Sequence, residues 1–130
     1  MYKFSLIIPC YNEEKNLPKL FSKFSHSFKN YEIEIIFVDN GSTDNTNKLL
    51  SEFSKKKKNV KVIRVKQNIG YGYGIIQGLN KSSGNFIGWT HADLQTDPED
   101  FIEAVKLIEK NKGENIFVKG VRHGRNYFDI

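Results

Sequence analysis

The stretch Ile33-Glu34-Ile35-Ile36-Phe37-Val38-Asp39-Asn40-Gly41-Ser42-Thr43-Asp44 decides the fold class of this protein. Its first half, Ile33–Val38, is a short β-branched run and predicts a strand. Its second half is a cluster of turn and helix-capping residues, and a helical pattern that carries Leu49, Leu50 and Phe53 follows. A strand that passes through a polar turn into a helix is the βα unit from which parallel sheets are built.

The same unit recurs along the chain. Further strands are predicted at Phe4–Pro9, Val60–Val65, Asn85–Thr90 and Ile116–Val121. Apolar residues at helical spacing predict the helices between them: Leu17, Leu20, Phe21, Phe24 and Phe28 in the first, Ile75, Ile76 and Leu79 in the third, and Phe101, Ile102, Val105 and Ile108 in the last. We therefore predict an α/β fold with a mainly parallel sheet, flanking helices and strand order 3-2-1-4 in its first part.

Capping residues predict where two of these helices begin. Asn16 is the candidate N-cap of the first helix, with Pro18 in its first turn. Asp97 is the candidate N-cap of the last helix, with Pro98 at the first helical position and acidic residues in the first turn.

Length and composition limit the class of protein. The chain has 130 residues and 38% hydrophobic content, which predicts one domain over residues 1–130. No apolar run approaches the roughly 18 residues needed to span a bilayer, and the N-terminus lacks the layout of a signal peptide, so we expect a soluble, cytoplasmic protein. Cys10 is the single cysteine, which excludes an internal disulfide, and we expect a small buried thiol there.

The formal charge of +5 comes partly from the run Lys55-Lys56-Lys57-Lys58. We interpret this run as a solvated helix end that the helix macrodipole favours. The alternative is attraction to an anionic lipid surface or to a phosphorylated substrate. Nucleic acid is not an expected partner, because the basic residues are not interleaved with aromatic ones as a stacking platform requires.

Polar clusters follow three of the predicted strands: Tyr11–Glu14, Asp39–Asn40 and His91–Gln95. Right-handed crossovers bring the carboxyl ends of parallel strands to one edge of the sheet, where such sheets bind ligands. In the 3-2-1-4 order all three clusters face one crevice. The Asp39 carboxylate can there accept hydrogen bonds from the N–H groups of uracil or guanine, and the alternative is an aspartate that only initiates a turn.

Asp93 and Gln95 stand two residues apart on a chain that leaves a strand. In extended conformation both side chains point to one side, so their oxygens form a candidate site for Mg²⁺ or Mn²⁺. Such a cation binds diphosphate oxygens and neutralises the charge that builds on a departing nucleotide. The alternative is an N-terminal helix cap with a neighbouring amide.

Glycines after the third predicted strand form a turn and a helix start, where missing Cβ atoms let backbone or ligand come close. The residues of this segment are Asn68, Gly70, Gly72, Gly74 and Gly78. The spacing differs from the dinucleotide-binding G-x-G-x-x-G pattern, because Ile75 or Gln77 replaces the third glycine. The sequence has no P-loop pattern, and the acidic Tyr11–Glu14 segment is unlike the basic glycine-rich loop of a sugar nucleotidyltransferase.

Four segments carry a family resemblance: Ser5–Glu14, Val38–Thr46, Asn68–Gly84 and His91–Pro98. In this order they are similar to the successive signatures of family 2 glycosyltransferases, which have the GT-A fold, and they most resemble the polyprenyl-phosphate sugar transferases of the dolichyl-phosphate mannose synthase type. The resemblance implies inverting transfer of a sugar from a UDP- or GDP-linked donor to a lipid-phosphate or glycan acceptor. It also implies a place in cell-envelope polysaccharide or glycolipid synthesis.

The resemblance assigns roles to particular residues. It implies nucleotide binding by Pro9, Tyr11, Glu13, Asp39, Asn68, Gly70 and Arg122, and metal ligation by Asp93 and Gln95. Arg122 is the candidate diphosphate clamp through its planar guanidinium, and an exposed arginine without a ligand is the alternative. His91 stands where family members often carry aspartate, so it is either a third metal ligand that favours Mn²⁺ over Mg²⁺ or a non-ligand.

We expect the chain to be the N-terminal, donor-binding portion of such a transferase, with the acceptor site and the general base placed after Ile130. Peripheral contact with the inner face of a membrane is a further expectation. The alternative function is a nucleotide-sugar-binding module without turnover of its own.

Overall fold

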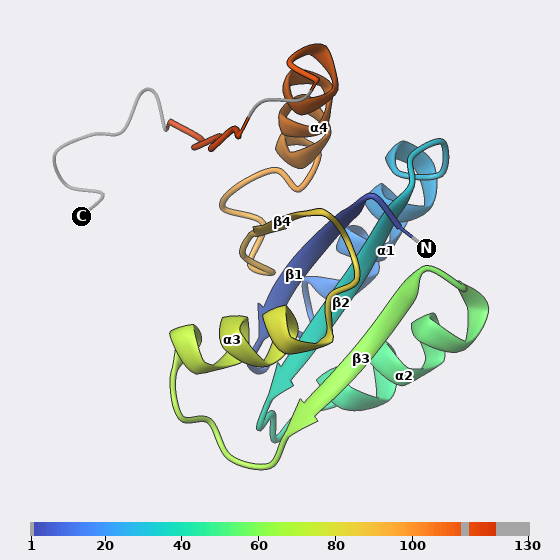
Figure 1. The fold of residues 1–130 in the computed structure, drawn as a ribbon. Helices are drawn as coiled ribbons and strands as arrows, with labels where there is room; N and C mark the ends of the chain where they lie inside the picture. The colour runs from blue at the N-terminus through green and yellow to red at the C-terminus, as the bar shows by residue number, and fades with distance from the viewer. Residues whose placement is uncertain (1, 113–114, 122–130) are drawn as a thin grey trace, which may run out of the picture.

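Four parallel strands in the order β3-β2-β1-β4 form the sheet of the computed structural model, which describes residues 2–112 and 115–121 (Figure 1). The elements along the chain are β1 (Phe4–Cys10), α1 (Leu17–Ser27), β2 (Ile33–Asn40), α2 (Thr46–Lys56), β3 (Val60–Val65), α3 (Tyr71–Lys81), β4 (Phe86–Trp89) and α4 (Asp100–Lys110). The predicted fold class and the predicted strand order are confirmed.

Helices cover both faces of the sheet. α1, α2 and α4 pack on one face around a core that includes Leu6, Phe24 and Phe37. α3 packs on the other face over β1 and β2, where Leu79 contacts a smaller cluster that contains Ile7 and Ile36. Because both of their faces are covered, the central strands β1 and β2 are buried along their whole length.

The strand boundaries correct three predictions. β2 continues through Asn40, so Asp39 and its neighbour are the last residues of a strand and not the first of a turn. β4 covers only Phe86–Trp89. The predicted fifth strand at Ile116–Val121 is wrong, since residues 115–121 form no strand. The side chain of Phe117 is 83% exposed, and an apolar run forms a strand only where a neighbour offers a ladder and a packing surface.

Two predicted caps also differ. α1 begins directly after Asn16, but the Asn16 side chain makes no capping bond and its amide instead donates to Glu13 Oε2 at 2.8 Å. α4 begins at Asp100, and Asp97 Oδ1 accepts the N–H of Glu99 at 3.0 Å in the turn before the helix. Cys10 is a buried thiol, as predicted.

α3 faces the sheet with glycine. Ile76, which the helical pattern assigned to the core, is 53% exposed, whereas Gly74 and Gly78 are buried. A Cβ atom at Gly78 would overlap the side chain of Ile7. The missing side chain therefore sets how closely α3 lies on β1.

Replacing Gly78 by alanine is expected to destabilise the protein by about 1–3 kcal/mol, because a packed interface must open to admit the methyl group. Gly72 of the same helix has no atom within 4 Å of its would-be Cβ. Gly72→Ala is therefore the matched control and should stabilise the chain by about 0.5–1 kcal/mol through helix propensity. Urea unfolding of both variants measures the difference, and equal midpoints would show that α3 is not closely packed.

A buried carboxylate lies where β1 and β2 begin. Glu34 is fully buried, and its Oε1 accepts hydrogen bonds from Ser5 Oγ at 2.6 Å, from Ser83 Oγ at 2.9 Å and from the Ser83 N–H. Lys61 Nζ lies 2.9 Å from Oε2. Burial acts to raise the pKa of Glu34, but these hydrogen bonds outweigh it and lower the pKa to about 2. The carboxylate thus joins three strands to the loop before β4.

Candidate functional site

The corners after β1 and β2 are fastened to each other. Asn12, in the left-handed region with φ of 51°, accepts the backbone N–H groups of Thr43 at 2.8 Å and Asp44 at 3.3 Å through Oδ1. Its own N–H donates to Ser42 Oγ at 3.0 Å. Glu13 N–H donates to Thr46 Oγ1 at 2.8 Å. The two corners therefore form one unit at the carboxyl ends of their strands.

Three carboxylates of these corners are engaged in hydrogen bonds. Glu14 Oε2 accepts the N–H of Asn45 at 3.2 Å, just before α2, and Glu13 accepts the Asn16 amide. Asp44 Oδ1 accepts the N–H of Thr46 at 2.9 Å. Burial acts to raise the pKa of Asp44, but hydrogen bonds from Thr46 and from the Glu14 N–H outweigh it and hold the pKa below its usual value. The three side chains stabilise the corners, including Glu13, which the resemblance assigned to the nucleotide pocket.

Asp39, at the end of β2, has an oxygen without a hydrogen-bond donor. Its side chain is fully buried, and Oδ1 accepts the N–H of Ser42 at 3.1 Å. Within the described residues, Oδ2 accepts no hydrogen bond. Arg64 Nε lies 3.9 Å away, which is too long for a hydrogen bond and leaves a contact between charges. A buried carboxylate oxygen with unused lone pairs can accept a hydrogen bond from a ligand N–H.

The start of α3 is attached to the ends of β1 and β2. Asn40 Nδ2 donates to the carbonyl of Gly70 at 2.9 Å, and Asn68 Oδ1 accepts the Gly70 N–H at 2.9 Å. A Cβ on Gly74 would lie 3.5 Å from Pro9 Cβ. Gly41 has φ of 75°, and a Cβ there would lie 2.7 Å from the backbone nitrogen of Asn68. Three strand ends therefore meet around these small residues.

The corner after β4 is a tight loop and not an extended chain. Leu94 takes φ of 64°, and Asp93 Oδ1 accepts the N–H of Gln95 at 3.1 Å. The prediction that both side chains leave an extended segment on one side is therefore wrong. The Thr90 and Thr96 hydroxyls meet at 3.2 Å and close the loop. Leu94 and Asn12 are non-glycine residues with positive φ, a conformation that costs energy. Both lie in corners at the same edge of the sheet.

Tyr71, the first residue of α3, connects this loop to the other corners. Its ring stacks on the His91 imidazole with 4.9 Å between ring centroids and 13° between ring planes. Burial, followed by the negative charge of Asp93, raises the pKa of the Tyr71 phenol. The Asp93 carboxylate thus lies near the start of α3.

The donor set permits only a partial metal site. Among residues 2–112 and 115–121, no three His, Cys, Asp or Glu side chains gather closely enough to hold an ion by themselves. Asp93 and Gln95 supply oxygens and His91 a nitrogen, which suits a hard or borderline divalent cation. The residues fit a cation that takes its remaining ligands from a bound diphosphate.

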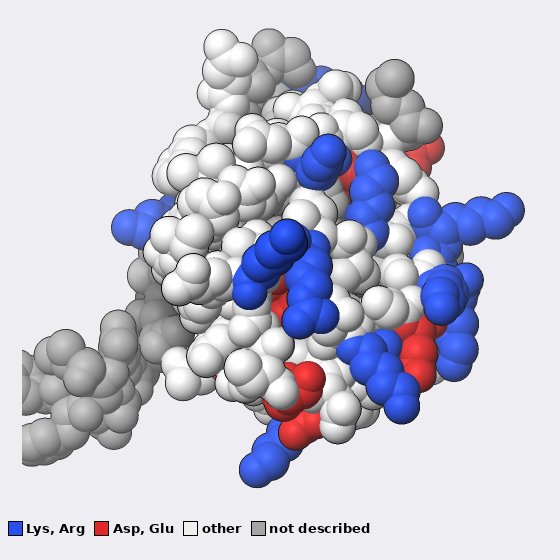
Figure 2. Space-filling model, turned by 90° about the horizontal axis from the view of Figure 1, so that it is seen from below, with Lys and Arg blue, Asp and Glu red and all other residues white. Residues whose placement is uncertain are grey.

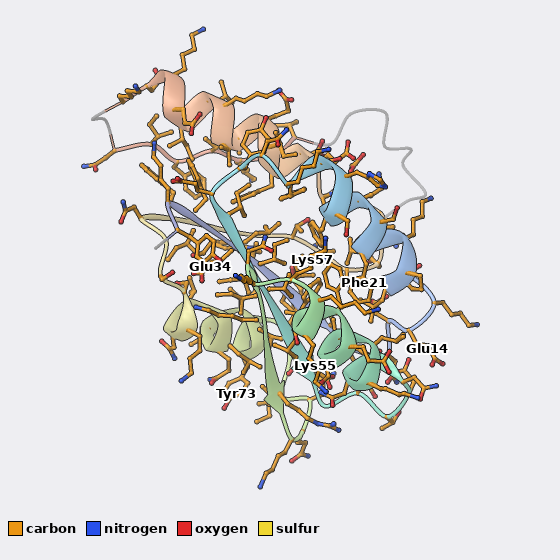
Figure 3. The ribbon with its side chains drawn as sticks, turned by 90° about the vertical axis from the view of Figure 1, so that its right-hand side faces the viewer. Glu14, Phe21, Glu34, Lys55, Lys57 and Tyr73 are labelled. Carbon is orange, nitrogen blue, oxygen red and sulfur yellow. The ribbon has the colours of Figure 1, made fainter. Side chains whose placement is uncertain are left out.

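The face at the carboxyl ends of the strands carries a mixed charge. Figure 2, seen from below the view of Figure 1, shows lysine and arginine side chains around a few acidic ones. Basic residues of these corners include Lys15, Arg64 and Lys66, all exposed. In Figure 3, Glu14 and Tyr73 flank the sheet from the α1–α2 side and the α3 side. The basic side chains at this edge can attract an anionic ligand.

The sequence-derived site residues that the structure describes lie at one edge of the sheet. Pro9, Tyr11, Glu13, Asp39, Asn68, Gly70, His91, Asp93 and Gln95 all end a strand or lie in the corner that follows one. Arg122 lies outside the described residues. Sequence reasoning missed Arg64 and Tyr71. Counting back from the end of the third strand could have found Arg64, because Asp39 and Arg64 are register partners in the 3-2-1-4 order.

Other doubly wound α/β folds also have this strand order, and the structural neighbours identify the class of this chain as the GT-A sugar transferases. Residues 5–130 match the family model described as Glycosyl transferase family 2. The chain therefore belongs to family 2 of the glycosyltransferases.

Individual relatives agree with this assignment. The chain is 40% identical over 123 residues to a dolichol-phosphate mannosyltransferase of Pyrococcus furiosus, covering 95% of this chain and 35% of the relative. It is 38% identical over 111 residues to an undecaprenyl-phosphate 4-deoxy-4-formamido-L-arabinose transferase of Proteus mirabilis, covering 83% and 34%. The crystal structure of S. aureus TarS 1-349 in complex with UDP-GlcNAc has a TM-score of 0.70 and 26% identity, covering 93% and 37%. The chain spans about a third of the length of the two curated relatives.

Proposed function

We propose that this chain binds a nucleoside-diphosphate sugar at the carboxyl edge of its sheet and supplies the donor-binding part of an inverting glycosyltransferase. The observation that carries the proposal is Asp39 Oδ2, a buried carboxylate oxygen that accepts no hydrogen bond from the described residues. A UDP-GlcNAc complex of a structural neighbour and the sugar-transferase names of the relatives support it.

In this proposal each corner binds a different part of the donor. Asp39 accepts an N–H of the base, and Tyr11, which is 47% exposed and follows the register partner of Asp39 in sequence, offers a ring for the base or ribose. Pro9 and Gly70 lie where α3 meets the strand ends, below the proposed position of the donor. The basic residues of this face draw in the diphosphate.

The divalent metal belongs to the same proposal. Mg²⁺ or Mn²⁺ would be held by Asp93 and Gln95, and it would neutralise charge on the departing nucleoside diphosphate. His91 is a further ligand, and the Tyr71 ring fixes the plane of its imidazole. A nitrogen ligand makes Mn²⁺ the preferred ion.

The acceptor is proposed by analogy with the names of the relatives, which act on dolichol phosphate and undecaprenyl phosphate. A lipid-phosphate acceptor would bring the protein to a membrane surface in cell-envelope synthesis, and a glycan is the other acceptor class. None of the helices in the described ranges is long and apolar enough to cross a bilayer.

A binding module without turnover is the second candidate. Glu13, Glu14 and Asp44, acids of the corners after β1 and β2, each accept a hydrogen bond from a residue at or next to a helix start. These bonds give each of the three a structural role, which favours a donor-binding role for these 130 residues.

Calorimetric titration of the 130-residue chain with UDP and GDP, with and without Mn²⁺, tests the proposal. We expect binding that Mn²⁺ strengthens. A donor hydrolysis assay then separates the two candidates, because turnover requires a base and a binding module does not. Absence of binding to either nucleotide would refute the proposed function.

Asp93→Asn is expected to weaken Mn²⁺-dependent UDP binding by on the order of 10–100-fold, because an amide is a poorer metal ligand than a carboxylate. The asparagine keeps the Oδ1 acceptor for Gln95 N–H, so the loop should persist. Asp100→Asn, on an exposed residue in the first turn of α4, is the control. Mn²⁺ binding can be followed directly by electron paramagnetic resonance, and equal affinities for both variants would remove Asp93 from the metal site.

A further inference from the structure

β3 is an edge strand whose outer side is open. It ends the sheet and pairs with β2, and within residues 2–112 and 115–121 no further strand pairs with its outer side. The Asn59 carbonyl accepts the Ile35 N–H at 2.8 Å, and a parallel ladder repeats every two residues, so the backbone groups of Ile63 face β2. The N–H and C=O groups of Val62 and Arg64 therefore point outward, away from β2.

A groove between β3 and α2 runs beside these outward-facing groups. Its cavity has a volume of about 440 Å³, and its lining on the β3 side includes Val62 and Arg64. The lining residues on the α2 side are Asn47, Ser51, Ser54 and Lys55. Their spacing of i, i+4, i+7 and i+8 places them on one face of the helix. The groove thus presents hydroxyl, amide and cationic groups next to an open strand edge.

The positive charge of the chain is concentrated around this groove. Residues 46–66, which span α2 and β3, hold eight of the twenty basic residues and one of the fifteen acidic residues, Glu52. The rest of the chain has the remaining twelve basic and fourteen acidic residues, so its net charge is slightly negative. Figure 3, which views the molecule from the side of this edge, labels Lys55 and Lys57 at the end of α2. An anionic partner is therefore attracted to this edge of the molecule in particular.

We propose that the outer edge of β3 and its groove bind an extended acidic segment of a partner protein, which adds a strand to the sheet. The backbone of the segment pairs with the N–H and C=O groups of Val62 and Arg64. Its carboxylates meet the charged groups of Lys55 and Arg64, and its side chains directed toward α2 contact Ser51. The proposal does not depend on the nucleotide site, which lies at the carboxyl ends of the strands.

The same features disfavour other occupants. A second copy of the chain would bring one basic edge against another, and charged residues such as Lys61 on an edge strand oppose that pairing. A lipid surface offers negative charge but no row of backbone donors and acceptors, so it would leave the edge of β3 unpaired. An extended acidic peptide satisfies both the charge and the open backbone groups.

Fluorescence anisotropy of a labelled peptide of alternating glutamate and threonine, titrated with the 130-residue chain, tests the proposal. This peptide is expected to bind at least about tenfold more tightly than a peptide of alternating lysine and threonine. Amide hydrogen exchange then locates the contact: the N–H groups of Val62 and Arg64 should exchange rapidly in the free protein and at least about tenfold more slowly with the acidic peptide. The Ile63 N–H, which faces β2, should exchange slowly in both cases. Absence of binding, or binding without protection of Val62 and Arg64, overturns the proposal.

Blocked peptides separate strand pairing from simple attraction between charges. N-methyl groups on every glutamate remove the N–H groups along one edge of the peptide, and N-methyl groups on every threonine remove those along the other edge. The net charge is the same in both peptides. We expect one of them to bind as tightly as the parent peptide and the other at least about tenfold more weakly. Equal affinity of all three peptides would overturn the proposed strand addition.

Variants of the protein test the groove itself. Lys55→Glu should weaken the acidic peptide by on the order of tenfold, whereas Lys19→Glu, the same change on an exposed residue of α1, should have little effect. Ser51→Leu fills the groove without a change of charge and should also weaken the peptide. An equal loss in the two lysine variants, or full affinity in Ser51→Leu, would place the peptide elsewhere and overturn the proposal.

Cosedimentation with phosphatidylglycerol vesicles tests the lipid alternative. Weak vesicle binding that Lys55→Glu and Lys19→Glu change alike is the expected result, because the vesicle then responds only to net charge. Vesicle binding that only Lys55→Glu abolishes, together with no binding of the acidic peptide, would identify a lipid-binding surface and overturn the proposal.

Discussion

Asp39→Asn is expected to weaken UDP binding by on the order of 10–100-fold, because a charge-assisted hydrogen bond to the base is lost. The asparagine still accepts the Ser42 N–H through Oδ1, and its amide then meets the base N–H with another donor. Calorimetry measures the affinity, and thermal unfolding measures the stability of the same variant.

Although its UDP affinity falls, Asp39→Asn should not lose stability. Asp39 is a fully buried carboxylate with one oxygen that no described donor satisfies, and a buried acceptor without a hydrogen bond is costly. We expect the melting temperature of Asp39→Asn to be equal to or above that of the unmodified chain. Glu52→Gln, an exposed change of the same charge on α2, controls for net charge. Undiminished UDP affinity in Asp39→Asn would remove this residue from the donor site.

Glu34→Ala should produce the largest loss of stability, on the order of 3 kcal/mol, because it leaves the buried hydroxyl of Ser5 without an acceptor and removes the partner of Ser83. Lys61 is 47% exposed and can turn to water, which keeps the loss at the lower end of the range for buried pairs. Glu32→Ala, two residues earlier and exposed, should change stability by less than about 0.5 kcal/mol. Similar urea midpoints for both variants would contradict a structural role for the Glu34 cluster.

Acid should reveal the same cluster. The pKa of Glu34 is lowered from 4.5 to about 2, so the folded state binds this proton less readily than the unfolded chain. The contribution of Glu34 to stability is therefore fully present above pH 4.5 and is lost as the pH falls toward 2. In Glu34→Gln this part of the pH dependence should disappear. Unfolding curves are recorded at pH 6 and at pH 3. If the unmodified chain and Glu34→Gln lose the same stability between these two pH values, the assignment is contradicted.

The sheet could be predicted because each βα unit is encoded by residues that are close together in the sequence. Phe4, Ile33 and Val60 start strands where the β-branched runs begin, and the observed bounds of β3 are those predicted. The run at Ile116–Val121 has the same composition but forms no strand in the described residues. Composition gives strand propensity, whereas a strand also needs a partner, and local sequence does not encode that partner.

The site was predictable only as a set of corners. The residue types at the strand ends indicated Asp39 and Asp93, and parallel order placed them at one edge. The left-handed turn at Leu94, the Tyr71–His91 stack and the bonds from Asn12 to the next corner were not predictable. Each of these depends on contacts between segments that are separated along the chain.

The sequence alone determined the alternation of strands and helices, and with it the edge where polar side chains gather, because hydrophobic period and turn chemistry act over a few residues. Only the tertiary structure decided which carboxylates are free to bind a ligand. Glu13, Glu14 and Asp44 are engaged by neighbouring loops, whereas one oxygen of Asp39 is left without a donor beside Arg64. Hydrogen-bond satisfaction depends on every group brought within about 3 Å, and packing across the sheet sets that proximity.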